Sequence, residues 1–332
     1  MSLFPAYRIV NDSGTVRGAL VQASLADLSP GDVLIRAAYS SVNYKDALAA
    51  TGAGKIVRRF PIVGGIDVSG TVESSGDPRF VPGARVLVTG YELGVAHDGG
   101  YAAYVRVPGE WVVPVPDGLS LFDAMALGTA GFTAALAVVR LERQGLRPDQ
   151  GPVAVTGATG GVGSIAVAAL SRLGYAVTAV SGKDDQHEYL RGLGAAAIVS
   201  RTTLDLGTRP LEKATWAGSV DAVGGDVLSW LVRTTNYWGS VASTGLTGGV
   251  DVRLTVMPFI LRGVSLIGVD SVMCPMELRR ETWRRLATDM KPRALESIAT
   301  VIALDGLDQA FATLVAGRAR GRFVVRLGEE AL

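Results

Sequence analysis

The chain has 332 residues, 48% of them hydrophobic and 19% charged, with a formal net charge of +1. Its length exceeds the roughly 250–300 residues at which one hydrophobic core stops growing, so we expect two domains, and its composition excludes a disordered chain. The balanced charge disfavours nucleic acid and membrane surfaces as partners. No run approaches the about 18 apolar residues of a membrane helix and no signal peptide pattern is present, so we expect a cytoplasmic protein.

The first third of the chain predicts a compact, mostly β domain. Short β-type runs, separated by Gly and Pro, occupy residues 7–115. After Ser120, which can cap a helix, the pattern changes to helical spacing over residues 121–125 and 133–142. We therefore expect a first domain of residues 1–122.

A strand-then-helix alternation fills the centre of the chain. Apolar β-type runs recur at residues 152–156, 176–180, 196–199, 220–223, 240–243 and 265–269. Such alternation predicts an α/β fold, a doubly wound parallel sheet covered by helices, which we place at residues 123–292. The remaining segment, 293–332, is expected to return to the first domain. Helices are expected at 277–290 and 307–316, and strands at 298–303 and 322–327.

A glycine-rich turn separates the first of these strands from its helix. Within Thr156-Gly-Ala-Thr-Gly-Gly-Val-Gly-Ser164, the residues Gly161, Gly163 and Ala166 fit the spacing G-x-G-x-x-A. Glycine allows positive φ and removes the Cβ where a pyrophosphate approaches the helix amino terminus. Because the turn follows a strand, opens a helix and is followed by a second strand, it favours dinucleotide binding over an ordinary tight turn.

The end of the second strand indicates which dinucleotide is bound. An NAD enzyme places Asp or Glu there, whereas this chain has Ser181-Gly-Lys183, and a hydroxyl with a cation suits the 2′-phosphate of NADPH. Asp184 and Asp185 follow directly and are interpreted as a helix cap. Arg201, after the third strand, is either a second phosphate ligand or a solvated surface arginine.

Metal and thiol chemistry is disfavoured by the side-chain inventory. Cys274, His97 and His187 are the only cysteine and histidines, too few for a catalytic zinc, so no metal is expected. His97 is expected in a solvent-facing loop, and His187 on the polar face of a helix. Cys274 has no basic neighbour in sequence that would activate a thiolate, and it is interpreted as a packing residue.

Several segments together resemble one known family. They are Ser41-Val-Asn43-Tyr44-Lys45-Asp46, Gly65-Ile-Asp67-Val-Ser-Gly70, Gly128-Thr129-Ala130-Gly131-Phe132-Thr133-Ala134, the glycine-rich turn, Ser181-Gly-Lys183 and Gly268-Val-Asp270-Ser271-Val272. In this order, over essentially the whole chain, they resemble the zinc-free quinone oxidoreductase-like branch of the medium-chain dehydrogenase/reductases, and within it the acryloyl-CoA reductase subgroup. The resemblance implies a GroES-like catalytic domain, a Rossmann cofactor domain, an active site in the cleft between them, and reduction of acryloyl-CoA to propionyl-CoA with NADPH.

The resemblance also implies the cofactor contacts. By position these are Tyr44, Thr129, Thr159, Gly160, Gly161, Val162, Gly163, Ser181, Gly182, Lys183 and Arg201, with Leu246, Val269 and Asp270 near the nicotinamide half. Lys183 departs from the subgroup, where Arg is common. The substitution keeps the positive charge but loses the planar fork that binds phosphate through two hydrogen bonds.

The expected chemistry is hydride addition to the β-carbon of an unsaturated thioester, followed by protonation at the α-carbon. The catalytic candidates are Tyr44, Asn43 and Asp67. For the proton donor Tyr44 comes first, a bound water second and Asp67 third, and the Tyr44 hydroxyl or a backbone N–H could stabilise the enolate oxygen. Tyr44 could instead pack against the cofactor.

Four cations are candidates for substrate binding. Lys55, Arg58 and Arg59 form a local basic cluster, which either holds the phosphates of CoA or is a solvated loop. Arg322, which opens the last strand, is expected to extend towards the cleft.

Three alternatives remain open from the sequence. The chain could be a quinone or small-enone reductase, which would need no CoA-binding cations, or an NADPH-binding protein without turnover. A zinc alcohol dehydrogenase is disfavoured by the missing ligands. A homodimer is expected, formed by edge-to-edge extension of the sheet at residues 265–269.

Overall fold

The computed structural model describes residues 3–328. These form two compact units: the first unit contains the chain up to Thr129 and again from Leu295, and the second unit is Ala130–Ala294. The sequence-based boundaries lie after residues 122 and 292, close to the points where the chain passes from one unit to the other.

The first unit is mostly β, and the larger of its two sheets contains strands from both parts of the chain. Its elements are β1 (Phe4–Asp12), β2 (Thr15–Ala23), η1 (Leu25–Asp27), β3 (Val33–Val42), α1 (Tyr44–Thr51), β4 (Ile62–Val63), β5 (Asp67–Ser75), β6 (Arg85–Thr89), β7 (Tyr104–Val107), η2 (Gly109–Trp111), β8 (Val113–Pro114), α8 (Leu295–Ile298), β15 (Ala299–Ile302), η5 (Leu304–Gly306), α9 (Leu307–Val315) and β16 (Arg322–Arg326).

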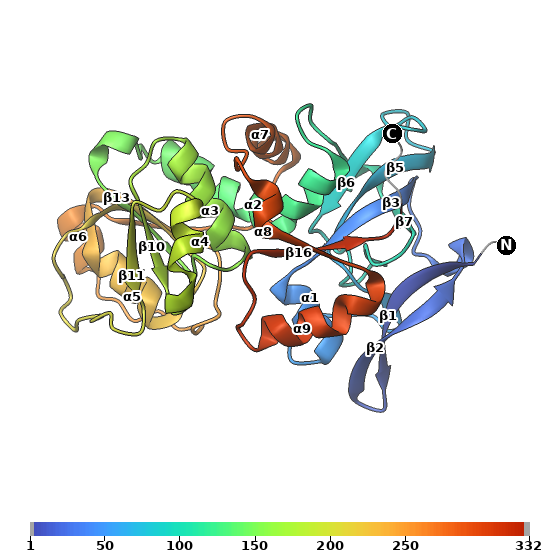
Figure 1. Ribbon diagram of the computed structural model, residues 1–332, viewed down its shortest axis with the longest axis horizontal. Helices are drawn as coiled ribbons and strands as arrows, with labels where there is room; N and C mark the ends of the chain where they lie inside the picture. Colours follow the sequence, from blue (N-terminus) through green and yellow to red (C-terminus); the bar gives the residue numbers. More distant parts are fainter. Residues whose placement is uncertain (1–2, 329–332) are drawn as a thin grey trace. The chain divides into compact units, whose positions relative to one another are not determined.

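Pairing within this unit joins distant parts of the sequence. The larger sheet has the order β15-β16-β3-β5-β6-β8, with β7 also paired to β3, and a smaller sheet has the order β2-β1-β4. Strand β16 pairs antiparallel with β3, so that Phe323 lies opposite Val42. Helices α1 and α9 pack against each other although more than two hundred residues separate them (Figure 1). Strand β16, the last one among residues 3–328, is therefore an integral part of the first unit.

The second unit is an α/β domain. Its elements are η3 (Pro148–Gln150), β9 (Val153–Thr156), α3 (Gly161–Arg172), β10 (Val177–Ser181), η4 (Asp184–Gln186), α4 (His187–Gly192), β11 (Ala197–Ser200), β12 (Trp216–Asp221), α5 (Gly225–Thr234), β13 (Thr235–Ser243), α6 (Met257–Arg262), β14 (Ser265–Gly268) and α7 (Met276–Ala287). Every neighbouring pair of its strands is parallel.

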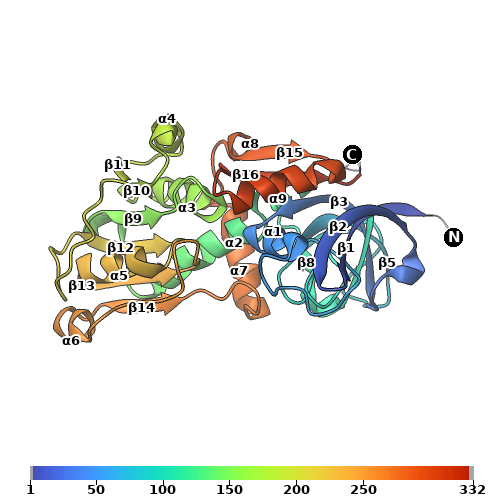
Figure 2. The ribbon, with the colours of Figure 1, turned by 90° about the horizontal axis from the view of Figure 1, so that it is seen from below.

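The strand order of this sheet is β11-β10-β9-β12-β13-β14, which Figure 2 shows from β11 to β14. Counted along the chain it is 3-2-1-4-5-6, the order of a Rossmann fold, whose ligands bind where the order reverses, between β9 and β12. Residues of β9, β10 and β12 are buried throughout, which explains their continuous runs of small and apolar residues. The six predicted runs correspond to the six strands.

One predicted strand is shifted. The run at residues 220–223 marks only the end of β12, which starts earlier, at Trp216, because Ala217, Gly218 and Ser219 are small residues of low strand preference that the buried sheet nevertheless accommodates. The backbone leaves the strand at the paired glycines Gly224 (φ +76°) and Gly225 (φ +58°).

The helical pattern after Ser120 forms one long element, α2 (Leu121–Arg143), interrupted at Gly128, whose backbone (φ 52°, ψ −156°) is not helical. By length and composition α2 could cross a membrane, which the count of consecutive apolar residues did not indicate. However, 83% of its apolar window is buried inside the protein, as in a core helix.

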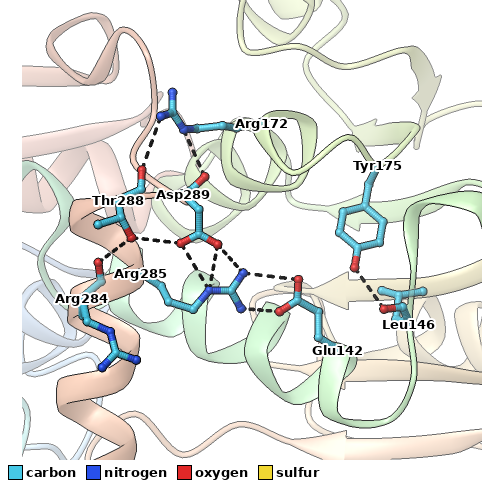
Figure 3. A network of polar contacts seen from close by, with 8 residues as sticks. All are labelled: Glu142, Leu146, Arg172, Tyr175, Arg284, Arg285, Thr288 and Asp289. Atoms are coloured by element: carbon cyan, nitrogen blue, oxygen red, sulfur yellow. Dashed lines mark hydrogen bonds and ion pairs between the residues drawn. The ribbon is translucent and has the colours of Figure 1, made fainter.

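A polar network fixes the end of α7 within the second unit (Figure 3). The Arg285 guanidinium pairs with both Glu142 of α2 and Asp289, and Arg172 of α3 donates to the backbone carbonyls of Thr288 and Asp289. These contacts join α7 to α2 and α3 within the second unit.

Candidate functional site

The glycine-rich turn lies at the carboxyl edge of the parallel sheet. Gly157 (φ +59°) follows β9 directly, and Gly160 is the residue before the first turn of α3, where it supplies no side-chain acceptor to the helix N–H groups. A Cβ on Gly163 would lie 2.2 Å from the Gly157 carbonyl oxygen, so only glycine lets α3 approach the turn this closely. Free helix N–H groups beside a backbone without side chains form a phosphate-binding site.

The next strand places a second group of predicted residues at the same edge. Ser181 ends β10 and its hydroxyl accepts a hydrogen bond from the Lys183 N–H at 3.0 Å. The Arg201 N–H donates to the Ser181 carbonyl at 2.7 Å, and the Arg201 guanidinium lies 3.1 Å from where a Cβ on Gly182 would be. Burial lowers the pKa of Lys183. Asp184 and Asp185 are the first two residues of η4, and the cap position before them is Lys183, so their interpretation as a cap is wrong.

A buried carboxylate that the sequence interpretation missed joins two of these loops. Asp221 ends β12, beside β9, and accepts hydrogen bonds from the Thr156 hydroxyl at 2.6 Å and from the N–H groups of Val223 and Gly224. Burial raises the pKa of Asp221. In the sequence, Asp221 is an acidic residue at the end of a run of small residues. The same pattern is equally typical of a solvent-facing carboxylate, so it does not indicate burial.

The remaining predicted cofactor residues lie at the ends of the last two strands. Leu246 is exposed in the loop after β13, and half-buried Val269 and exposed Asp270 follow β14. Asp270 Oδ1 accepts the N–H groups of Val272 and Met273, which fixes the backbone of that loop. Because the carboxyl ends of parallel strands meet at one edge, these loops lie on the same side of the sheet as the glycine-rich turn.

In the first unit, Asp67 is the centre of a buried polar cluster. Its carboxylate has no exposed surface. Oδ2 accepts hydrogen bonds from the Ser41 hydroxyl (2.5 Å), the Asn43 amide (2.8 Å) and the Thr129 N–H (2.9 Å), and Oδ1 accepts one from the Thr129 hydroxyl (2.5 Å). Arg322 lies 3.8 Å away as the counter-ion.

These contacts correct three expectations. Asn43 and Asp67 are buried and committed to protein partners, so neither side chain is placed to contact a substrate. Arg322 is 3% exposed, and its guanidinium donates to the Val42 carbonyl, the Asn43 side chain and the Ser41 hydroxyl, so it does not reach outward as a substrate cation. A buried ion with no partner would cost several kcal/mol, and the Asp67 carboxylate is what permits Arg322 to be buried.

Helix α1 starts at the edge of this cluster. Asn43 precedes its first residue, Tyr44, and the Asn43 N–H donates to Asp46 Oδ2 at 2.8 Å. Asp46 also accepts the Ile66 N–H, and burial, reinforced by the nearby Asp67 carboxylate, raises the pKa of Asp46 to about 7. The spacing of Asn43 and Asp46 is that of a helix capping box, a local signal that could have identified Asp46. Tyr44, in contrast, is 37% exposed.

The basic cluster is exposed, as expected for either of its two interpretations. Arg58 pairs with Glu92 at 3.1 Å, and Arg59 pairs with Asp98 at 3.0 Å, while Lys55 makes no ion pair with residues 3–328. The carboxylates reduce the net positive charge that this loop offers to an anion.

Two further expectations are settled by burial. His97 is half-buried rather than solvent-facing: its Nε2 lies 2.7 Å from the Arg106 carbonyl oxygen, its ring packs on Trp111, and burial lowers its pKa. Cys274 is buried and burial raises the pKa of its thiol, in agreement with a packing role.

Comparison with known proteins identifies the family. The alcohol dehydrogenase GroES-like domain model matches residues 29–117, and the zinc-binding dehydrogenase model matches residues 161–290. The chain therefore belongs to the medium-chain dehydrogenase/reductases, in their quinone oxidoreductase-like branch, which confirms the resemblance and the fold class. The second model is named for zinc, but within residues 3–328 no three Cys, His, Asp or Glu side chains come together as metal ligands. The described residues do not fit a zinc site.

Individual relatives are similar over nearly their whole length. The chain is 48% identical over 315 residues to acrylyl-CoA reductase AcuI of Ruegeria pomeroyi. The aligned residues cover 95% of this chain and 96% of AcuI. It is 49% identical to the putative quinone oxidoreductase YhfP of Bacillus subtilis, covering 98% and 99%. The crystal structure of the Salmonella enterica yhdH oxidoreductase in complex with NADP has a TM-score of 0.95, with 47% identity and coverage of 98% and 100%.

The raised pKa of Asp46 predicts a pH-dependent contribution to stability. Between the ordinary pKa near 4 and the folded value of about 7, the folded chain holds a proton that the unfolded chain releases. This stability is fully present below the unfolded pKa and is lost as the pH rises through about 7. Asp46→Asn does not titrate, so we expect its destabilisation relative to wild type to shrink by about 2 kcal/mol between pH 5 and pH 8, measured by urea unfolding.

Asp117→Asn, at an exposed carboxylate of the same unit, is the control. Its difference from wild type should be the same at both pH values. An equal destabilisation by Asp46→Asn at pH 5 and pH 8 would show that Asp46 is not protonated in the fold.

Proposed function

We propose that this protein is an NADPH-dependent reductase of an activated C=C bond, with acryloyl-CoA as substrate and propionyl-CoA as product. The observation that carries the proposal is the carboxyl edge of the Rossmann sheet, where the glycine-rich turn and the Ser181, Lys183 and Arg201 group lie together. The similarity to an acrylyl-CoA reductase along almost the whole chain supports the substrate class.

The choice of NADPH is supported by the charge at the end of β10. Lys183 and Arg201 bring two cations next to the small Ser181 and Gly182, a combination that pairs with a 2′-phosphate. The yhdH structures with NADP and with NADPH are in agreement, whereas the Bacillus subtilis yhfP structure, 48% identical with a TM-score of 0.95, has NAD bound. A cytoplasmic location belongs to the same proposal, and the single cysteine, Cys274, is consistent with it.

In the proposed reaction the dinucleotide supplies the hydride that adds to the β-carbon of the thioester. Charge then develops on the thioester oxygen, and the resulting enolate takes a proton at its α-carbon. Of the three catalytic candidates only Tyr44 has an exposed side chain, so we assign the proton donation to its hydroxyl. Asn43 and Asp67 hold the chain beside it. Lys55, Arg58 and Arg59 remain the proposed contacts for the CoA phosphates.

A panel of acceptors tests the reaction. We expect the purified protein with NADPH to reduce acryloyl-CoA with kcat/KM at least tenfold higher than a simple benzoquinone, because a thioester bearing CoA phosphates is what the exposed cations would recognise. Crotonyl-CoA carries the same phosphates and measures the selectivity for the acyl chain alone. NADPH oxidation is followed by absorbance, and propionyl-CoA is identified by mass.

The quinone is included because of the name of the Bacillus subtilis relative. Preference for the quinone would leave the reductase class intact but overturn the substrate. Tight NADPH binding without turnover of any acceptor would overturn the enzyme assignment.

Replacement of Lys183 and Arg201 tests whether the protein prefers NADPH to NADH. Lys183→Gln combined with Arg201→Gln is expected to raise KM for NADPH at least tenfold, because each charge-assisted hydrogen bond to the 2′-phosphate is worth about 1.5–3 kcal/mol. KM for NADH, which lacks that phosphate, should change less than threefold. Arg191→Gln, at an exposed arginine of α4, is the control and should leave both values unchanged. An equal loss with NADPH and NADH would place both cations away from the 2′-phosphate.

A homodimer is part of the proposal and is supported by the edge of the second sheet. Strand β14 pairs only with β13 among the described strands, and exposed apolar side chains gather on the neighbouring elements: Tyr237, Trp238, Val256, Met257, Ile260, Leu261 and Leu266. A second copy related by a two-fold axis would extend the sheet through β14 and cover these side chains.

Sedimentation equilibrium tests this association. Wild type is expected at twice the chain mass, and Leu266→Lys should shift it toward the monomer because a charge would be buried at the paired edge. Val81→Lys, at an exposed apolar residue of the first unit, should not. A wild-type monomer at micromolar concentration excludes the dimer.

A further inference from the structure

Stability alone does not explain why Asp67 and Arg322 form a buried ion pair. Neither charge reaches solvent, and the Ser41 hydroxyl bridges them, donating to Asp67 at 2.5 Å and accepting from Arg322 at 2.7 Å. Replacement of a buried ion pair by apolar residues is often neutral or stabilising in proteins, because desolvation offsets the attraction. A pair embedded in this way is therefore better explained by what it holds in place.

What it holds most directly is Asn43. The Asn43 amide donates to Asp67 at 2.8 Å through Nδ2 and accepts from Arg322 at 3.1 Å through Oδ1, while its backbone N–H donates to Asp46. Three separate contacts thus fix the residue that immediately precedes Tyr44.

Tyr44 itself has little else to orient it. Its side chain is 37% exposed and makes no hydrogen bond with residues 3–328. The position from which its side chain extends is set by the backbone at the start of α1, which the contacts of Asn43 hold.

The cluster is also closed from the side of α2. A Cβ on Gly128 would lie 2.5 Å from the Ser41 hydroxyl and 2.7 Å from the Asp67 carboxylate, and Thr129 donates to Asp67 with both its N–H and its hydroxyl. The Asp67 carboxylate is buried and accepts four hydrogen bonds from the protein, so the cluster acts on the reaction only through the residues that it holds.

We propose that Asp67, Arg322 and Ser41 are positioning residues, which through Asn43 hold the start of α1 so that Tyr44 presents its hydroxyl to the substrate in one orientation. This inference rests on the proposed function, in which Tyr44 donates the proton. Loosening the cluster should lower kcat and leave the binding of NADPH unchanged.

Ser41→Ala and Ser69→Ala form a matched pair of variants. Both serines are fully buried in the first unit and each hydroxyl donates one hydrogen bond, Ser41 to Asp67 and Ser69 to the Leu121 carbonyl at 2.7 Å. We expect both variants to lose thermal stability, and Ser41→Ala to lose more, because the Ser41 hydroxyl bonds two charged groups and the Ser69 hydroxyl one neutral carbonyl. Ser41→Ala should lower kcat for acryloyl-CoA about tenfold with KM for NADPH within twofold of wild type, while Ser69→Ala should keep kcat within twofold.

A double-mutant cycle with Tyr44→Phe shows whether the effect passes through Tyr44. If it does, Ser41→Ala should cost about tenfold in the wild-type background and no more than twofold in the Tyr44→Phe background. The same tenfold loss in both backgrounds, or equal kcat for Ser41→Ala and Ser69→Ala, would overturn the proposal. A Tyr44→Phe variant with full kcat would overturn it as well, while the reductase assignment would stand. A wild-type protein that does not reduce acryloyl-CoA would instead refute the proposed function itself.

If Ser41→Ala does not fold, Thr129 supplies the same test. Thr129→Val removes a hydroxyl that donates to Asp67 while keeping the shape, and Thr129→Ser keeps the donor. We expect the valine variant to lose about tenfold in kcat and the serine variant to stay within threefold of wild type. Equal activity of the two variants would contradict the proposal, and a loss confined to KM for NADPH would assign Thr129 to the cofactor instead.

Discussion

Burial of the Asp67 carboxylate sets the strictest condition on the first unit. An ionised carboxylate without solvent must receive hydrogen bonds and a counter-charge. Here these come from four residues: Ser41 in β3, Asn43 just after it, Thr129 beside the kink of α2, and Arg322, the first residue of β16. The antiparallel pairing of β16 with β3 is what brings Arg322 within reach. Strand β16 therefore supplies the counter-charge of Asp67 as well as a strand of the larger sheet.

The second unit depends on a different constraint, the close approach of backbone to backbone at the carboxyl edge of its sheet. Gly163 lets α3 lie against the turn after β9, and Asp221 joins that turn to the loop after β12 through Thr156. These two strands are the ones between which the strand order reverses. Because Asp221 accepts three hydrogen bonds from these loops, the edge is fixed by the chain itself before any ligand binds.

The sequence predicted features that depend on local pattern and missed those that depend on distant contacts. The glycine-rich turn, the six strands of the parallel sheet and the group at Ser181 are each readable within about 20 residues. The bond between Ser41 and Arg322 spans 281 residues, and nothing near Arg322 in the sequence distinguishes a buried arginine from an exposed one. For the same reason His97 was expected in solvent, although Trp111 covers it. Asp46 was missed although its capping-box spacing is visible in the sequence, because its burial depends on contacts with distant residues.

The distribution of positive charge distinguishes the proposed positioning residues from the proposed binding residues. Arg322 is consumed by internal partners, so it can orient Asn43 but cannot attract an anion. Lys183 and Arg201 differ from Arg322 in exposure, since Lys183 is half-buried and Arg201 is exposed at the edge of the sheet. Specificity between two dinucleotides that differ by one phosphate is a difference of binding free energies, which a few such cations can set without any change in the fold. A relative of nearly identical fold with NAD bound fits the proposal that the sheet and turn bind what both dinucleotides share and that the side chains after β10 recognise the 2′-phosphate.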